Sequence, residues 1–187
     1  MCGIIAILGL NDRKTDIAQI SKMNSLHRLR GPDHAEEIIL NNGTLALAHS
    51  RLSVIDLSDQ AHQPMSTEDE MHWIVYNGEV YNYLELKKQL IGCGVAFSSQ
   101  SDTEVVLKAL RHWGIRAVSM LEGIFGFVYV DLSKKFMLAA RDRLGVKPLC
   151  FFQSKDVMAF SSTVKPLQIL DEFNYEIDDI ARFEIGR

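Results

Sequence analysis

The residue with the most distinctive chemistry in this sequence is Cys2, which directly follows the initiator methionine. If Met1 is removed, Cys2 carries both a thiol and a free α-amine, and a small second residue favours that removal. An unperturbed α-amine has a pKa of roughly 7.7–8, so near neutral pH a fraction of it is free to accept a proton. Such an amine can act as the base for the nucleophile on its own side chain. The alternative is a cysteine that is only buried in a strand, which is common for free cysteines.

Length and composition place the chain among ordinary folded proteins. Its 187 residues are 47% hydrophobic and 24% charged, which suits one domain, or a domain and a half, with a real core. The formal net charge is −4 and there is no basic run, so we expect no binding to nucleic acid or to an anionic membrane. No apolar stretch reaches the roughly 18 residues of a transmembrane helix. The apolar start lacks the basic region and cleavage site of a signal peptide, so a strand is expected there.

The three cysteines, Cys2, Cys93 and Cys150, are too few and too far apart for a disulfide framework or a zinc motif. A reducing, cytoplasmic location is therefore the default expectation. The six histidines show no metal-ligand spacing, so no metal site is expected. His49 falls on an apolar strand face, which indicates a satisfied core histidine. A papain-like site that pairs Cys93 or Cys150 with a distant histidine stays open, although no pattern supports it.

Hydrophobic periodicity predicts a mixture of strands and helices. Strands are predicted at residues 2–9, 38–40, 44–50, 71–76, 124–130, 136–140 and 157–160. Helices are predicted at residues 82–91 and 164–170 and after the capping residues Asp16 and Ser101. Residues 56–72 read as a long polar loop, and Asn77-Gly78 as a turn after the 71–76 strand. Antiparallel groups of strands with helices between them favour an α+β fold of packed sheets covered by helices.

A series of further motifs follows Cys2 along the chain. They are MCGII (residues 1–5), RGPD (30–33), AHSRLSVID (48–56), YNGEVYN (76–82), SDTE (101–104), GIFGF (123–127) and RDRLGVKPL (141–149). In order and spacing the series resembles the class II, or N-terminal nucleophile, glutamine amidotransferases, and among them the glutaminase half of glutamine-dependent asparagine synthetases. The phosphoribosylpyrophosphate and hexosamine-phosphate amidotransferases share the MCGI start but differ at the RGPD and RLSVID blocks.

This resemblance implies a four-layer αββα sandwich, in which two antiparallel sheets are flanked by helices. It also implies that Cys2 attacks the side-chain carboxamide of glutamine and forms a thioester, while its α-amine moves the proton. The oxyanion hole of the family maps onto the side-chain amide of Asn77 and the backbone N–H of Gly78. Without the other motifs, an ordinary turn would be the preferred reading of Asn77-Gly78.

The resemblance further assigns residues that bind the substrate. Arg51 matches the residue that holds the α-carboxylate of glutamine, and a guanidinium fork suits that group. Asp102 matches the acid that receives the α-ammonium, and it also suits the first turn of a helix. For either residue alone, a salt bridge or a helix-end role would be the plainer interpretation. Other residues expected along the pocket are Leu52, Ser53, Val54, Ile55 and Glu79.

Two charged partners would select free glutamine over a glutamine residue within a peptide. Arg30 and Asp33 are expected to brace the loop around the site. Asp142 and Arg143 are expected to play the same structural role near the domain interface.

We therefore expect a glutaminase domain at residues 1–170 and the start of a linker at residues 171–187. The linker would lead to an ATP-dependent synthetase domain, in cis or in trans, whose serine-glycine-rich phosphate loop does not occur in this sequence. ATP and Mg²⁺ are expected only in that domain, so no cofactor is expected here, and a homodimer is left open. Two alternatives remain: a non-catalytic module that binds glutamine or a partner, and an N-terminal-cysteine hydrolase of another amide.

Overall fold

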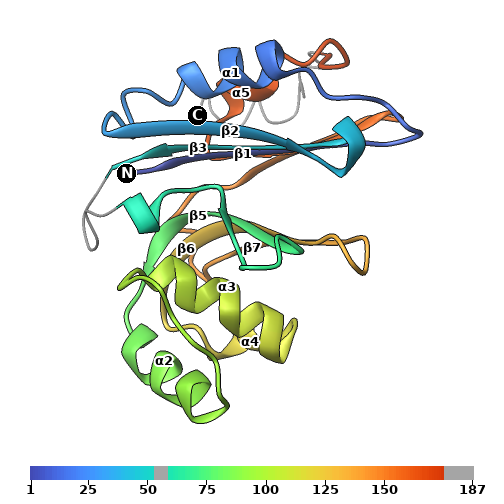
Figure 1. Ribbon diagram of the computed structural model, residues 1–187. Helices are drawn as coiled ribbons and strands as arrows, with labels where there is room; N and C mark the ends of the chain where they lie inside the picture. The colour runs from blue at the N-terminus through green and yellow to red at the C-terminus, as the bar shows by residue number, and fades with distance from the viewer. Residues whose placement is uncertain (53–58, 175–187) are drawn as a thin grey trace.

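The structure is a computed structural model that describes residues 1–52 and 59–174. Two antiparallel sheets lie face to face between two layers of helices (Figure 1). The strand order is β2-β3-β1-β9-β8 in the first sheet and β4-β5-β6-β7 in the second. The α+β class and the four-layer αββα arrangement are therefore confirmed.

Each layer is built from a few short elements. The first sheet contains β1 (Gly3–Gly9), β2 (His34–Leu40), β3 (Leu45–Arg51), β8 (Cys150–Gln153) and β9 (Val157–Ser161). The second contains β4 (Met65–Ser66), β5 (His72–Val80), β6 (Gly123–Asp131) and β7 (Phe136–Arg141). The first sheet is covered by α1 (Ile17–Ser25) and α5 (Val164–Leu167), and the second by α2 (Tyr83–Gly92), α3 (Asp102–Trp113) and α4 (Arg116–Met120) (Figure 1). The 3₁₀ turns are η1 (Asn41–Gly43) and η2 (Asp59–Ala61).

Three clusters of buried apolar side chains hold the two sheets and the two helix layers together. Successive side chains of a strand point to opposite faces, so Ile5 and Ile7 of β1 pack beneath α1 while Ile4 and Ala6 face the second sheet. Both faces of β1 are buried, and this is why its sequence is a continuous apolar run. The strand was predicted from that run. Between the sheets, β1 and β3 meet Val75 of β5 and its neighbours on β6. This central layer fixes the spacing of the two sheets.

The largest correction concerns Asn77-Gly78, where the predicted turn is wrong. β5 continues through both residues to Val80 and stays in register with β6 over its whole length. Gly78 does not have a positive φ; instead, a Cβ built on it would lie 2.5 Å from the carbonyl oxygen of Ile124. Close approach of two strands, rather than a turn, therefore requires the glycine.

Smaller corrections concern elements that are short. β8 and α4 were not predicted, and α5 ends at Leu167 rather than at residue 170. Asn82 precedes α2 as predicted, but its side chain does not cap that helix. It instead contacts the backbone of Met120 and Glu122, and so ties α2 to the end of α4. Residues 53–58 of the polar segment and 175–187 of the predicted linker lie outside the described residues.

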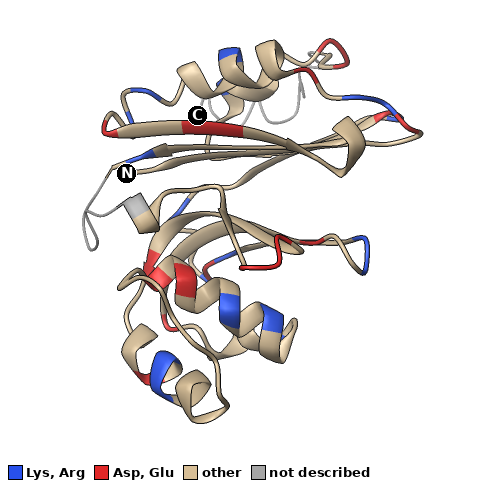
Figure 2. Cartoon of the chain, in the orientation of Figure 1, with Lys and Arg blue, Asp and Glu red and all other residues tan. Residues whose placement is uncertain are grey.

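Charge is distributed along α3 as a helix dipole favours. Acidic residues occupy its first turn and basic residues its last, as Figure 2 shows. The Ser101 hydroxyl accepts the N–H of Thr103 and caps the helix as predicted. Within residues 1–52 and 59–174, no helix has the length and apolar character needed to cross a membrane.

The close contact at Gly78 gives a testable prediction. We expect Gly78→Ala to lower the free energy of unfolding by about 1–3 kcal/mol, because a methyl group there overlaps the backbone of β6. Urea denaturation followed by circular dichroism would measure this. Gly92→Ala is the matched control, since nothing lies within 4 Å of a Cβ at that position. A Gly78→Ala variant as stable as Gly92→Ala would contradict this register between β5 and β6.

Candidate active site

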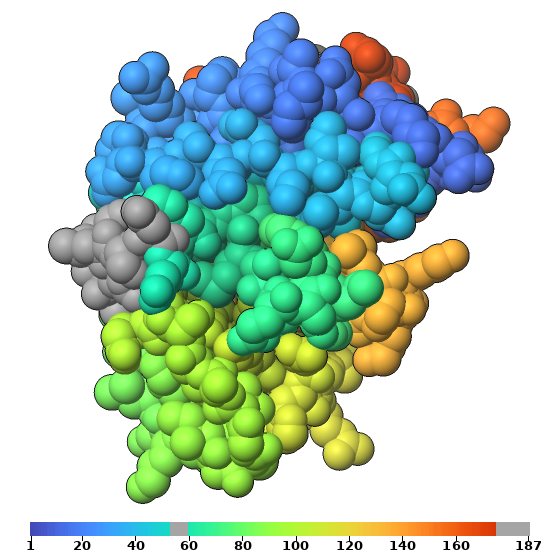
Figure 3. Space-filling view, in the orientation of Figure 1, coloured from blue at the N-terminus to red at the C-terminus, as the bar shows by residue number. Residues whose placement is uncertain are grey.

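A cavity of about 180 Å³ opens where the start of β1 meets β5 and the beginning of α3. It collects predicted site residues that are far apart in the sequence: Cys2, Arg51, Leu52, Asn77, Gly78, Glu79 and Asp102. The predicted residues Ser53, Val54 and Ile55 lie outside the described residues. In Figure 3 the green residues of the segment leading into β5 lie between the blue upper half and the yellow-green lower half. Because its lining residues include Arg51 of β3 and Asn77 of β5, the cavity depends on both sheets.

Cys2 lies beside the end of β3, because the neighbouring Gly3 pairs with Ser50. The N–H of Leu52 donates to the Cys2 sulfur at 3.4 Å. Arg30 braces this corner as predicted, since its Nε donates to the carbonyl oxygen of Cys2 at 3.1 Å. The α-ammonium of Met1 donates to the carbonyl oxygen of Arg30, also at 3.1 Å. With Met1 in place the free amine belongs to Met1, and its removal would transfer that role to Cys2.

β5 presents one edge to β6, and its other edge faces the cavity beyond the two residues that β4 covers. Alternate residues of a strand direct their N–H groups to the same edge. On the cavity edge, the N–H of Tyr76 donates to Oε1 of Gln63 at 2.6 Å, and the N–H of Val80 donates to Oδ2 of Asp102 at 3.0 Å. Gly78 lies between these residues in the same alternation, so its N–H also faces the cavity.

The side chain of Asn77 adds a second donor. Asn77 is 2% exposed, and its Nδ2 has no hydrogen-bond partner within the described part of the chain. Leaving a buried donor without a partner costs about 1–3 kcal/mol, and such groups are rare in folded proteins. The side chains of Trp73, Val75 and Asn77 lie on the same face of β5. Because Trp73 and Val75 pack between the sheets, the side chain of Asn77 faces the first sheet, where Cys2 lies. An oxygen atom of a bound molecule would satisfy this donor.

Asp102 supplies a buried carboxylate at the start of α3. It is 5% exposed and accepts hydrogen bonds from the Tyr76 hydroxyl at 2.8 Å and from the N–H of Val80. Burial raises the pKa of Asp102 above its ordinary value, with a further contribution from Glu79, and the hydrogen bonds from Val80 and Tyr76 only partly oppose this. Arg51, 6% exposed, lines the same cavity. The pocket thus offers a guanidinium and a buried carboxylate.

Comparison with known proteins identifies the family. A family profile described as "Glutamine amidotransferase domain" matches residues 1–185. The chain belongs to this glutamine amidotransferase family. The family predicted from the motif series is therefore confirmed.

Individual relatives agree with this assignment. The domain is 35% identical to asparagine synthetase (glutamine-hydrolyzing) 1 of Bacillus subtilis (strain 168), over 95% of this chain and 28% of the relative. It is 38% identical to asparagine synthetase (glutamine-hydrolyzing) 1 of Arabidopsis thaliana, over 80% of this chain and 25% of the relative. The chain thus spans only about a quarter of the length of these two relatives.

A solved structure supports the fold. The glutamine phosphoribosylpyrophosphate amidotransferase of Bacillus subtilis, complexed with ADP and GMP, superposes with a TM-score of 0.72 and 21% sequence identity, over 90% of this chain and 43% of that chain. At this identity the likeness shows the fold alone. The arrangement of sheets and helices in this domain is therefore one that a solved amidotransferase structure shares.

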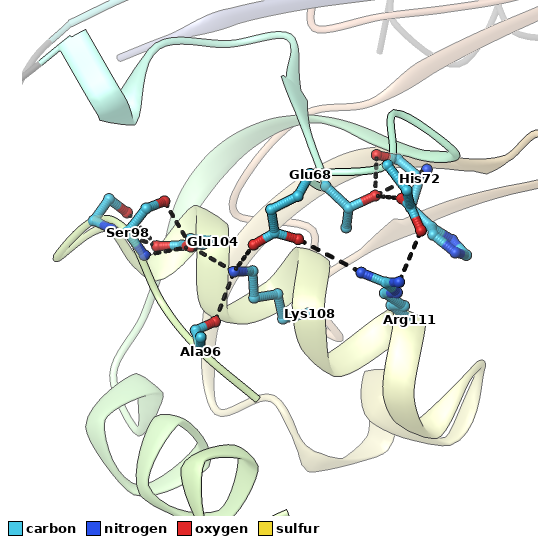
Figure 4. A network of polar contacts seen from close by, with 10 residues as sticks. Glu68, His72, Ala96, Ser98, Glu104, Lys108 and Arg111 are labelled. Atoms are coloured by element: carbon cyan, nitrogen blue, oxygen red, sulfur yellow. Dashed lines mark hydrogen bonds and ion pairs between the residues drawn. The ribbon is translucent and has the colours of Figure 1, made fainter. Parts of the chain in front are cut away.

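A polar network fixes the segment that precedes Asp102 (Figure 4). Glu104, 3% exposed, accepts hydrogen bonds from the backbone N–H and the hydroxyl of both Ser98 and Ser99. Lys108 pairs with Glu104 at 2.9 Å and with Glu68 at 2.7 Å. Burial alone would raise the pKa of Glu104, but the hydrogen bonds from Lys108 and the two serines outweigh it and lower the pKa to about 2. The network therefore anchors residues 98–101 and, with them, the start of α3.

The histidines of the domain differ in part from expectation. His49 is fully buried as predicted, and its Nε2 lies 3.2 Å from the carbonyl oxygen of Tyr76. Since a carbonyl only accepts, Nε2 carries the hydrogen; Nδ1 has no partner among the described residues, so His49 is only half satisfied. Two other histidines, His34 and His62, lie together, and their rings stack with 3.6 Å between the ring centroids.

His34 and His62 lie close to Glu36, and these three residues could supply metal ligands. The two rings are nearly parallel, with an interplanar angle of 12°. The nitrogen lone pairs of each ring lie in its own plane, so the rings as placed do not point at one ion. No hydrogen bond joins Cys93 or Cys150 to a histidine in the described parts of the chain, which leaves the papain-like alternative without support.

Sequence reasoning missed several residues that line the cavity. Gln63, Thr103 and Lys147 belong to its wall, yet none was assigned a role. Thr103 and Lys147 fall within the SDTE and RDRLGVKPL motifs. For Gln63 the signal was the length of the polar segment that contains it, because long loops often indicate function. Asp142 was expected to brace a loop, and it does so by accepting the N–H groups of Val146 and Lys147 at 2.9 Å.

The lowered pKa of Glu104 predicts a pH-dependent contribution to stability. A carboxyl whose pKa is lower in the folded state stabilises the fold above its unfolded pKa and loses that effect as the pH falls through the folded value. We expect Glu104→Gln to lower the free energy of unfolding by about 2–3 kcal/mol at pH 7. The difference from wild type should shrink between pH 4.5 and about 2.

Urea titrations at a series of pH values would measure this difference. Glu122→Gln, at an exposed position, is the matched control and should match wild type throughout. A Glu104→Gln penalty that does not change with pH would contradict the ionised state of Glu104.

Proposed function

We propose that this amidotransferase domain hydrolyses L-glutamine to L-glutamate and ammonia through a thioester on Cys2. The observation that carries the proposal is the buried Nδ2 of Asn77, which has no partner among the described residues and lies in the same cavity as the Cys2 thiol. The cavity-facing N–H of Gly78 supplies a second donor. A nucleophile beside two preorganised donors is the arrangement that acyl transfer requires.

The reaction follows from these groups. After removal of Met1, the α-amine of Cys2 takes the thiol proton, and the thiolate attacks the carboxamide carbon of glutamine. Negative charge develops on the amide oxygen, where Asn77 and Gly78 donate hydrogen bonds. The amine returns the proton to the nitrogen, the C–N bond breaks and ammonia leaves. Water then adds to the thioester, which releases glutamate and restores the thiol.

Charge in the cavity favours a free amino acid as the substrate. Arg51 can form a bidentate pair with the α-carboxylate of glutamine. Asp102 can receive the α-ammonium, because the groups that donate to its Oδ2, the Tyr76 hydroxyl and the Val80 N–H, are neutral. A glutamine residue within a peptide carries neither charge. The pair of residues therefore separates this proposal from a hydrolase of another amide.

The ammonia would be consumed by an ATP-dependent synthetase domain, in cis or in trans, that converts aspartate to asparagine or amidates a related acid. The names and greater length of the relatives support this part of the proposal. ATP and Mg²⁺ would be needed in that domain only, because hydrolysis of glutamine through a thioester involves no phosphate group.

The nucleophile can be tested by intact mass after incubation with the glutamine-analogue electrophile 6-diazo-5-oxo-norleucine. We expect wild type to show loss of Met1 and a single adduct, because the thiolate displaces N2 from the protonated diazo carbon of the analogue and forms a stable thioether. Cys2→Ala should form no adduct and should hydrolyse no glutamine, while Cys93→Ala should behave as wild type. Retained Met1 without an adduct would favour a non-catalytic binding module.

Substrate recognition can be tested with variants of the charged pair. We expect Arg51→Ala and Asp102→Asn each to raise KM for glutamine about 10- to 100-fold, since a hydrogen bond to a charged group contributes about 1.5–3 kcal/mol. Asp102→Asn should also reduce the preference for glutamine over N-acetylglutamine, which lacks the ammonium. Steady-state ammonia release would measure both effects. Unchanged KM in both variants would favour another amide substrate.

A further inference from the structure

We propose that Gln63 is a positioning residue for the two donors on β5, the Asn77 amide and the Gly78 N–H. It would do so by fixing the peptide group of Tyr76, the residue that precedes them. The inference rests on the proposed glutaminase function, and it assigns a role to a residue that the motif series does not single out.

Both polar ends of Gln63 are engaged. The side chain is buried, at 4% exposure. Its Oε1 accepts the N–H of Tyr76 at 2.6 Å, and its Nε2 donates to Oγ1 of Thr103 at 3.3 Å. Gln63 therefore links β5 to the first turn of α3. A buried amide held at both ends has little freedom to move, so it can act as a fixed acceptor.

The position of Gln63 follows from the register of the sheet. β4 pairs with β5 only through Met65↔Ile74 and Ser66↔Trp73. If this register is continued by two residues, Gln63 lies opposite Tyr76. Gln63 itself is not part of β4, which begins at Met65. The N–H of Tyr76 would be a buried donor without a strand partner, which is costly. The side chain of Gln63 supplies the acceptor that the missing strand would have provided.

Other groups hold the same residue. The carbonyl oxygen of Tyr76 accepts from Nε2 of His49 at 3.2 Å, and its hydroxyl donates to Asp102. Two residues beyond Gly78, the N–H of Val80 is bound to Asp102 as well. The donors at positions 77 and 78 thus lie between two fixed points. Among the described groups that contact Tyr76, only Gln63 binds its N–H.

Loss of this contact should affect chemistry more than substrate binding. Donors in an oxyanion hole act on charge that develops in the transition state, so a change in their position lowers kcat and leaves KM nearly unchanged. Removing one such donor outright costs about 100- to 1,000-fold in kcat. Displacing donors that remain present should cost less.

The experiment compares Gln63→Met, which removes the acceptor at similar length, with Gln60→Met as the matched control. Gln60 belongs to the same segment but is exposed and does not line the cavity. We expect Gln63→Met to lower kcat for glutamine about 10- to 100-fold with KM within about threefold of wild type. Amide hydrogen exchange at Tyr76 should accelerate. Gln60→Met should match wild type in all three measurements.

A folded Gln63→Met variant with wild-type kcat would overturn the inference, as would a rise in KM without a fall in kcat. If Gln63→Met does not fold, Gln63→Asn replaces it, because the shorter side chain keeps both polar groups but withdraws Oε1 from Tyr76. The same kcat criterion then applies to it. Wild-type enzyme is assayed in parallel: absence of glutamine hydrolysis there would refute the proposed function itself, which is a different outcome.

Discussion

The site depends on the edge of β5 that faces the cavity. Buried backbone polar groups need partners, and β6 supplies them for one edge of β5 along its whole length. On the other edge, β4 covers only Trp73 and Ile74. Beyond that point, side chains from the rest of the fold take the place of a strand and bind the N–H groups of Tyr76 and Val80. The N–H of Gly78 is left between them, facing the cavity.

The proposed nucleophile and the proposed oxyanion-hole donors belong to different sheets. Cys2 precedes β1 in the first sheet, whereas Asn77 and Gly78 lie on β5 in the second. Their separation is set by the apolar layer between the sheets, where Ile4 and Val75 are fully buried. Protein interiors are close-packed and respond to small changes of volume. The stability of this layer and the geometry of the proposed reaction are therefore coupled, although no polar group of the site belongs to the layer.

The sequence predicted what local patterns and motifs encode. The capping residues Asp16 and Ser101 mark the starts of α1 and α3, and both accept a backbone N–H as expected. Asn77-Gly78 misled because this dipeptide is a strong local signal for a turn, whereas its actual environment is set by pairing with β6, more than 40 residues away. Gln63 escaped notice for the same reason. Its role depends on where β4 ends relative to Tyr76, and that register is a property of the assembled sheet.

The electrostatics of the cavity suit a substrate that brings its own positive charge. Among residues 1–52 and 59–174, the groups that donate to Oδ2 of Asp102 are the neutral Tyr76 hydroxyl and Val80 N–H rather than a cation. Burial is the main reason that the pKa of Asp102 is raised. An ammonium group beside this carboxylate would lower that pKa again, because a nearby opposite charge favours the ionised form. The interaction would also be stronger than at the surface, since water screens it less. A substrate amide without an ammonium group leaves the Asp102 carboxylate without a compensating charge. Discrimination against such a substrate therefore follows from the burial of Asp102 as well as from the lost contact between carboxylate and ammonium.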